Sequence, residues 1–168
     1  MLTLKKIKIR GFRAYMEEKE FTFDNPAILL FGENHCGKSS TVNAIEWCLF
    51  GNECMGAKLG IRERIDWEIP NRSLGSRPNV SIDLDLEDQD KKIYKIYRRY
   101  KSKTKDELKV TLPDGQTLEE EEAQKKIFYL LKSSYRDFLT TAYQHQETIR
   151  AVLTQEPRER NDAIDRLL

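Results

Sequence analysis

The fold is decided by residues 27–42, which read AILLFGENHCGKSSTV. Residues 27–31 form a continuous apolar run, which is typical of a strand buried on both faces. Residues 32–39 fit the pattern GxxxxGK[ST] in full, and residues 38–50 have the spacing of a helix that Gly51 would end. The expected buried face of this helix consists of Val42, Ile45 and Leu49. Strand, glycine-containing loop and helix in this order predict a phosphate-binding P-loop.

The residue types in this loop are those that phosphate binding requires. Two glycines allow the backbone to curl so that its N–H groups point inward, at a helix N-terminus that already favours negative charge. Lys38 would place its ammonium between the β- and γ-phosphates and act as the catalytic lysine, and the hydroxyl of Ser39 would bind Mg²⁺. The predicted ligands are therefore ATP and Mg²⁺. The candidate nucleotide-binding residues are Asn34, His35, Cys36, Gly37, Lys38, Ser39 and Ser40.

The remaining pattern predicts a mixed α/β fold in which an antiparallel β-meander accompanies the P-loop unit. Further strands are expected at residues 2–10, 21–23, 80–87, 93–100 and 108–112. Thr117 and Glu120 have the spacing of a capping box, which predicts a helix up to about Lys132. The residues expected to be buried by this helix are Ala123, Ile127, Leu130 and Leu131. Residues 51–78 are rich in Gly, Arg and Pro, and indicate a long irregular connection.

Composition narrows the class of protein. A chain of 168 residues fits one domain with a real core, and 39% hydrophobic with 34% charged residues is typical of a soluble protein. Lys plus Arg number 29 against 28 for Asp plus Glu, so nucleic acid could be bound only by a local patch. Three cysteines without a CxxC pair favour neither a disulfide framework nor zinc. No apolar run approaches a membrane span of about 20 residues, which favours the cytoplasm.

Several elements of a complete P-loop enzyme are missing from the sequence. The NKxD and DxxG motifs of GTPases do not occur. A Walker B strand ends an apolar run with Asp, and the nearest candidate, residues 80–88, alternates strictly, as in a half-exposed antiparallel strand. The module therefore has the residues to bind phosphates but lacks the acid that would organise metal and water.

A resemblance to a known family explains this incompleteness. Residues 4–13, LKKIKIRGFR, resemble the opening of SMC and SbcC-type ATPase heads, and residues 143–153, YQHQETIRAVL, resemble their Q-loop. The resemblance implies the N-terminal lobe of an ABC-type head over residues 1–153, followed at residues 154–168 by the start of a helix that leads into a coiled coil. In this family the signature motif, Walker B and the catalytic Glu lie on a distant C-terminal segment.

The resemblance also assigns roles to individual residues. Gln146 would bind Mg²⁺, sense the γ-phosphate and take part in catalysis, with Gln144 as its rival. Arg13 would lie near the nucleotide. The chain departs from the family at His35, where glycine is usual and a positive φ is expected, and at Cys36, where Ser or Gly is common. Two arginines of the 51–78 connection are weaker candidates for contact with nucleotide or DNA, and these are Arg62 and Arg64.

A basic hairpin is the candidate surface for nucleic acid. Its basic residues are interleaved with Tyr94, Tyr97 and Tyr100. Such a ribbon can neutralise phosphates without reading sequence, and Lys101, Lys103 and Lys105 are the named candidates. On charge alone, a solvated hairpin that offsets acidic neighbours fits equally well. The resemblance favours DNA.

Three functions follow from these observations. The first is an ATP-driven head acting on double-stranded DNA, in repair, chromosome organisation or phage defence. It would join its own C-terminal half and a second head that sandwiches ATP, with a nuclease subunit as a further partner; in a bacterium it would be nucleoid-associated. The second is a stand-alone P-loop kinase for a small molecule. The third is a nucleotide-binding scaffold that never hydrolyses ATP.

Overall fold

The structure is a computed structural model that describes residues 2–25, 27–51, 54, 69–75, 78–102, 105–135 and 138. The chain divides into two compact units, Met1–Leu130 and Leu131–Leu168, and the fold below belongs to the first. In the second, the backbone N–H of Phe138 donates to the carbonyl of Ser134 at 3.0 Å. The predicted Q-loop, the helix expected at residues 154–168 and most of the 51–78 connection lie outside the described residues.

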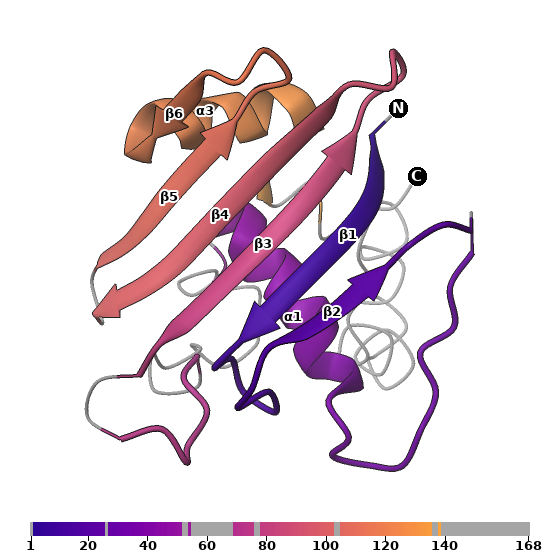
Figure 1. Ribbon diagram of the computed structural model, residues 1–168, viewed down its shortest axis with the longest axis vertical. Helices are drawn as coiled ribbons and strands as arrows, with labels where there is room; N and C mark the ends of the chain where they lie inside the picture. Colours follow the sequence, from indigo (N-terminus) through magenta and orange to yellow (C-terminus); the bar gives the residue numbers. More distant parts are fainter. Residues whose placement is uncertain are drawn as a thin grey trace, which may run out of the picture. The chain divides into compact units, whose positions relative to one another are not determined.

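A single antiparallel sheet forms the body of the first unit (Figure 1). Its strands are β1 (Thr3–Arg10), β2 (Lys19–Thr22), β3 (Val80–Glu87), β4 (Ile93–Ser102), β5 (Lys105–Thr111) and β6 (Thr117–Glu119). Their order is β2-β1-β3-β4-β5-β6, and every neighbouring pair is antiparallel. The predicted mixed α/β fold with an antiparallel meander is confirmed.

Period-two patterning decides which face of the sheet is buried. In β3, Val80, Ile82 and Leu84 are fully buried and alternate with half-buried polar residues. The pairing of β1 with β3 shifts by one residue between Leu4 and Lys6, so Leu4 lies opposite Leu86 and Ile7 lies opposite Leu84. This bulge returns the two apolar residues of β1 to one face although they are three residues apart. As predicted, residues 80–87 are an ordinary antiparallel strand.

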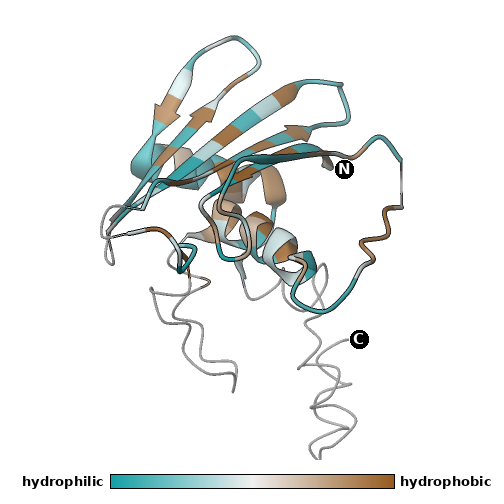
Figure 2. Ribbon diagram, turned by 60° about the horizontal axis from the view of Figure 1, so that its bottom comes forward, coloured by the Kyte–Doolittle hydropathy of each residue, from teal (hydrophilic) through white to brown (hydrophobic). Residues whose placement is uncertain are grey.

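Helix α1 (Lys38–Phe50) covers the apolar face and packs across β1, β3 and β4 (Figure 2). Its bounds agree with the prediction, and Gly51 ends it with φ 53° and an N–H bonded to the carbonyl of Trp47. The predicted buried face was partly wrong, because Val42 and Ile45 are only half-buried. Leu49 is buried as predicted. The other buried residues of the helix are Thr41, Asn43, Ala44, Glu46, Trp47, Cys48 and Phe50. The ring of Trp47 stacks on Phe12 at 5.8 Å, which turns this side of α1 inward.

The second described helix, α3 (Glu120–Leu131), follows β6 directly. The predicted capping box is wrong, because Thr117 belongs to β6 and pairs with Thr111 in the sheet. Pairing with β5 therefore extends the chain at Thr117 as a strand, and Thr117 does not serve as the N-cap of the helix. Ala123 and Ile127 are buried as expected, but Leu130 and Leu131 are only half-buried. The first turn is acidic as expected. Neither α1 nor α3 is long and apolar enough to cross a membrane, and no other helix of the described part is.

The apolar run at residues 27–31 does not form the predicted buried strand. It has no regular secondary structure, and Leu29 and Phe31 are 81% and 85% exposed. Figure 2 shows these apolar residues on the segment between β2 and α1, which swings away from the sheet. No strand of the described part pairs with this segment. A strand can be buried on both faces only where neighbours exist, and here none are present.

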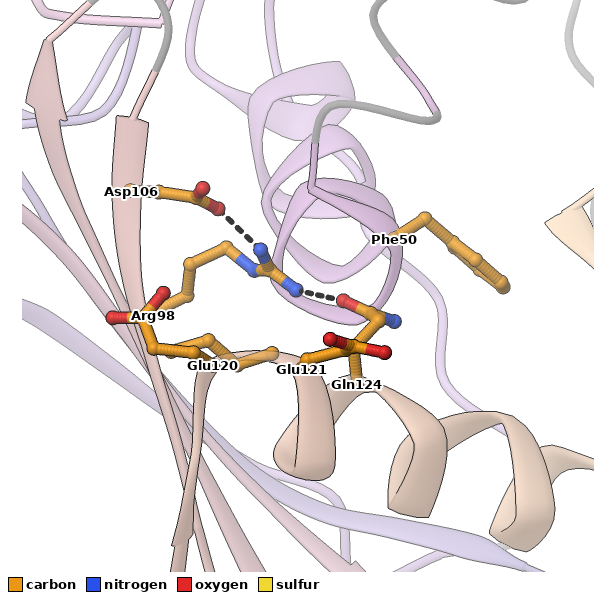
Figure 3. A pocket seen from close by; sticks show the side chains of 7 residues that line it. Phe50, Arg98, Asp106, Glu120, Glu121 and Gln124 are labelled. Carbon is orange, nitrogen blue, oxygen red and sulfur yellow. Dashed lines mark hydrogen bonds and ion pairs between the residues drawn. The ribbon is translucent and has the colours of Figure 1, made fainter.

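The C-terminal end of α1 is fixed by one buried cation, Arg98 of β4 (Figure 3). Its Nε donates to the carbonyl of Cys48 at 3.0 Å, and its two terminal nitrogens donate to Asp106 and Gln124. Gln124 in turn donates to the carbonyl of Leu49 at 2.9 Å. These side chains border a cavity of about 300 Å³. Arg98 thus joins two strands and both helices, with a positive charge at the negative end of the α1 dipole.

We expect Arg98→Met to lower the free energy of unfolding by about 3 kcal/mol, because it leaves the carbonyl of Cys48, the carboxylate of Asp106 and the amide oxygen of Gln124 without their donor. Arg99→Met is the matched control, since Arg99 is exposed and should change stability by less than about 0.5 kcal/mol. Chemical denaturation of both variants measures the difference. Equal losses would show that the network of Arg98 does not hold α1.

Candidate phosphate-binding site

The loop at residues 32–37 curls because three of its residues adopt positive φ. Gly32, His35 and Gly37 have φ of 149°, 67° and 100°. A Cβ on Gly32 would lie 2.9 Å from the sulfur of Cys36 and would displace that side chain, and the positive φ itself favours glycine. The positive φ expected at His35 is confirmed, and this is a conformation that histidine tolerates better than most residues.

Lys38 folds back over this curl. Its ammonium donates to the carbonyl of Gly32 at 2.8 Å and to that of Glu33 at 2.7 Å, and its nitrogen lies 3.7 Å from the sulfur of Cys36. The two carbonyls hold the cation at the mouth of the loop. A phosphate that entered here would meet the lysine already in place.

The loop leads directly into the N-terminus of α1. Gly37 is the N-cap residue, no side chain caps this end, and the first turn contains no acidic residue. The helix therefore presents unpaired N–H groups and the positive end of its dipole beside the lysine. Ser39 is exposed in this first turn, and Ser40 is half-buried. The predicted residues Asn34 to Ser40 thus form one continuous segment, exposed at residues 34–36 and 39, that joins the curled loop to the first turn of α1.

This geometry fits a polyphosphate with a magnesium ion. Curled amides and a helix N-terminus form an anion site, and the lysine supplies the matching charge. Mg²⁺ prefers oxygen ligands and keeps substrate phosphates among them, so Ser39 would supply the protein ligand. The described residues contain no group of three or more His, Cys, Asp and Glu side chains that could hold a metal by themselves.

The three thiols differ in their surroundings. Cys36 is exposed on the loop. Cys48 is fully buried, and burial raises the pKa of its thiol to about 12, although Arg98 nearby lowers it in part. Cys54 is 4% exposed and donates to the carbonyl of Gly51. Of the three thiols, that of Cys36 is therefore the one open to a reagent in solution.

The turn that carries Arg13 follows β1. Arg13 has φ 49°, its N–H donates to the carbonyl of Ile69 at 2.9 Å, and its own carbonyl accepts from Asn71 at 2.5 Å. Two residues later, Tyr15 bonds to Gly37 at the base of the loop. The predicted nucleotide contact therefore sits on a turn tied to the P-loop. The remaining predicted residues, Gln144, Gln146, Arg62, Arg64 and Lys103, lie outside the described part of the chain.

The β4–β5 hairpin carries its basic residues beside acidic ones. Lys101 pairs with Glu107 at 3.1 Å, and Lys109 pairs with Glu119 at 2.9 Å. Lys105 begins β5, directly before Asp106. Much of the charge along this hairpin is therefore balanced within the sheet.

Comparison with known proteins gives the family of the chain. The family model of the AAA domain matches residues 6–168. The chain belongs to the AAA domain family. This AAA domain is 42% identical over 48 residues to the chromosome partition protein Smc of Myxococcus xanthus. It is 30% identical over 88 residues to that of Halothermothrix orenii. These matches cover 29% and 52% of the chain, but only 4% and 7% of the relatives' lengths.

A solved structure is similar to this AAA domain over almost its whole length. It is the recombination mediator protein RecF with ATP, with 21% sequence identity and a TM-score of 0.58. The similarity covers 98% of this chain and 38% of RecF, and at this identity it concerns the fold alone. It confirms the predicted mixed α/β fold, and the AAA domain model and the Smc relatives support the resemblance to the N-terminal region of an SMC-type head.

Three residues that matter to the site were not found from the sequence. Arg98 could have been, because it alternates in phase with Ile96 and so points to the buried face. Tyr15 and Asn71 gave no such signal. Both bond to residues that are distant in the sequence: Tyr15 to Gly37, 22 positions away, and Asn71 to Arg13, 58 positions away.

Proposed function

We propose that the AAA domain binds ATP with Mg²⁺ at residues 32–40 and forms half of a head that hydrolyses it. The observation that carries this proposal is the ammonium of Lys38 held at 2.7–2.8 Å by two loop carbonyls, over an uncapped helix N-terminus. The solved RecF structure, whose title includes ATP, supports the choice of nucleotide. Lys38 and Ser39 would contact the β- and γ-phosphates and the metal.

We expect MgATP to slow the alkylation of Cys36 by iodoacetamide, because phosphates on the loop would cover its thiol. Lys38→Ala should abolish both ATP binding and this protection. Lys125→Ala is the control, since Lys125 pairs with Glu121 on the exposed side of α3. Mass spectrometry of the alkylated cysteines gives the rates, and buried Cys48 should remain unmodified throughout. Protection that survives in Lys38→Ala would place the nucleotide elsewhere.

The catalytic acid would come from a second segment, the C-terminal half of the head. Residues 27–31 support this proposal, because an apolar run leading into a P-loop is left exposed, with Phe31 at 85%. Strands added beside it would bury this surface and form the sheet that the sequence predicts. That half would also bring the Walker B residues, and Gln146 of the Q-loop would complete the metal site. A second head would then close over the ATP.

ATP turnover separates this proposal from its rivals. We expect residues 1–168 alone to hydrolyse no more ATP than the Lys38→Ala variant, and turnover to appear when the C-terminal half is supplied. A small-molecule kinase would transfer phosphate without the added half. A scaffold would stay inactive in both conditions. Release of inorganic phosphate measures all three outcomes.

Duplex DNA is the proposed substrate of the assembled head. The support is the basic hairpin around Lys101, Lys103 and Lys105, together with relatives named for chromosome partition. The ion pair of Lys101 with Glu107 offsets part of this charge in the absence of DNA.

Affinity for DNA falls with salt, and each phosphate contact adds about one to the steepness of log affinity against log salt. Reversal of these three lysines to Glu should therefore make this slope shallower by about 3. The matched control reverses Lys19, Lys91 and Lys125, which changes net charge equally at exposed sites elsewhere. Fluorescence anisotropy with a DNA duplex over a salt series measures the slopes. The same slope in both triple variants would rule out the hairpin.

A further inference from the structure

The phenol of Tyr15 meets the backbone at the point where the loop becomes helix. Its hydroxyl lies 3.2 Å from the carbonyl oxygen of Gly37 and 2.7 Å from the hydroxyl of Thr41. The Thr41 hydroxyl lies 3.2 Å from the same carbonyl. The two hydroxyls thus contact each other, and both lie within hydrogen-bond distance of the Gly37 carbonyl oxygen.

The turn that presents Tyr15 is held independently of this contact. Phe12 stacks on Trp47 of α1, and Asn71 donates to the carbonyl of Arg13. The ring of Tyr15 also packs edge-on against Phe21 of β2, with centroids 6.0 Å apart. These contacts fix the position of the Tyr15 side chain.

Tyr15 can approach Gly37 closely because glycine has no side chain. It has φ 100°, and a Cβ added there would lie 3.0 Å from the Tyr15 hydroxyl oxygen and 3.1 Å from the adjoining ring carbon. A side chain at Gly37 would push the ring away, besides being strained by the backbone. The glycine of the P-loop motif is thus needed on two sides, for the curl of the loop and for the approach of Tyr15.

The contact controls the direction of a loop amide. The carbonyl of Gly37 and the N–H of Lys38 belong to one planar trans peptide, so they point in opposite directions. The carbonyl accepts from the N–H of Thr41 at 3.0 Å as well as from the two hydroxyls. Fixing this oxygen on the helix side aims the N–H of Lys38 at the mouth of the loop, where an anion would bind.

We infer that Tyr15 is a positioning residue of the nucleotide site. Its hydroxyl holds the Gly37–Lys38 peptide in the orientation that binds phosphate, and it fixes the spacing between the P-loop and the turn that carries Arg13. This inference rests on the proposed function of the loop as an ATP site. Tyr15 itself touches no phosphate.

Tyr15→Phe tests the inference, because it removes the hydroxyl and keeps the ring that packs on Phe21. In the full-length protein we expect it to weaken MgATP binding between about three-fold and ten-fold, the effect of one hydrogen bond. The thermal midpoint without nucleotide should stay close to that of the wild type. Thr41→Val, which removes the other hydroxyl, should weaken binding similarly, and the double variant should be little worse than either single one. Calorimetric titration measures the affinities.

Tyr94→Phe is the matched control, since the hydroxyl of Tyr94 bonds to Asp88 at 3.3 Å in the β3–β4 turn and should not affect ATP. Unchanged affinity in Tyr15→Phe would overturn the inference even if its thermal midpoint fell, because Tyr15 would then only stabilise the fold. Fully additive losses in the double variant would also overturn it. Absence of ATP binding by the wild type would instead refute the proposed function of the loop, and with it any role for Tyr15 there.

Discussion

The site depends on one constraint, the fixed position of α1 against the sheet. Its N-terminal peptide is held by Tyr15 and Thr41, and its last carbonyls are held by Arg98 and Gln124. All of these partners except Thr41 come from outside the helix. A P-loop binds phosphate through amides whose directions are set before the ligand arrives, so the helix that carries them must be fixed at both ends.

The two ends are fixed by different kinds of interaction. At the C-terminal end a buried guanidinium offsets the negative end of the helix dipole and donates to the carbonyl of Cys48, which would otherwise lack a donor. At the N-terminal end the anchors are neutral hydroxyls that bind on the helix side of the Gly37 carbonyl. A neutral anchor leaves the positive potential of the loop unopposed. An acidic cap would instead accept from the free N–H groups of the helix and repel the phosphate.

Away from the site, charged residues on the sheet are paired with one another. On its outer face lysines of β1, β4 and β5 pair with acidic residues, as in Lys8 with Glu20 and Lys101 with Glu107. Exposed pairs of this kind contribute about 0–1 kcal/mol each, so their main effect is to cancel charge. Burial raises the pKa of Asp83 on this face, although Lys8 opposes the effect. The ammonium of Lys38, by contrast, is bonded to two uncharged backbone carbonyls.

The sequence by itself determined the elements whose signals are local. The loop motif, the bounds of α1 with its stop at Gly51, and the alternation of β3 follow from spacing and backbone chemistry within a few residues. Tertiary structure alone decided the features that need distant partners. Thr117 joined a strand instead of capping a helix because β5 offers its backbone, and residues 27–31 stayed exposed because the described residues supply no neighbouring strand. Tyr15 reached Gly37 because β1 delivers its turn beside α1, and that proximity depends on how the chain folds back, which no local pattern contains.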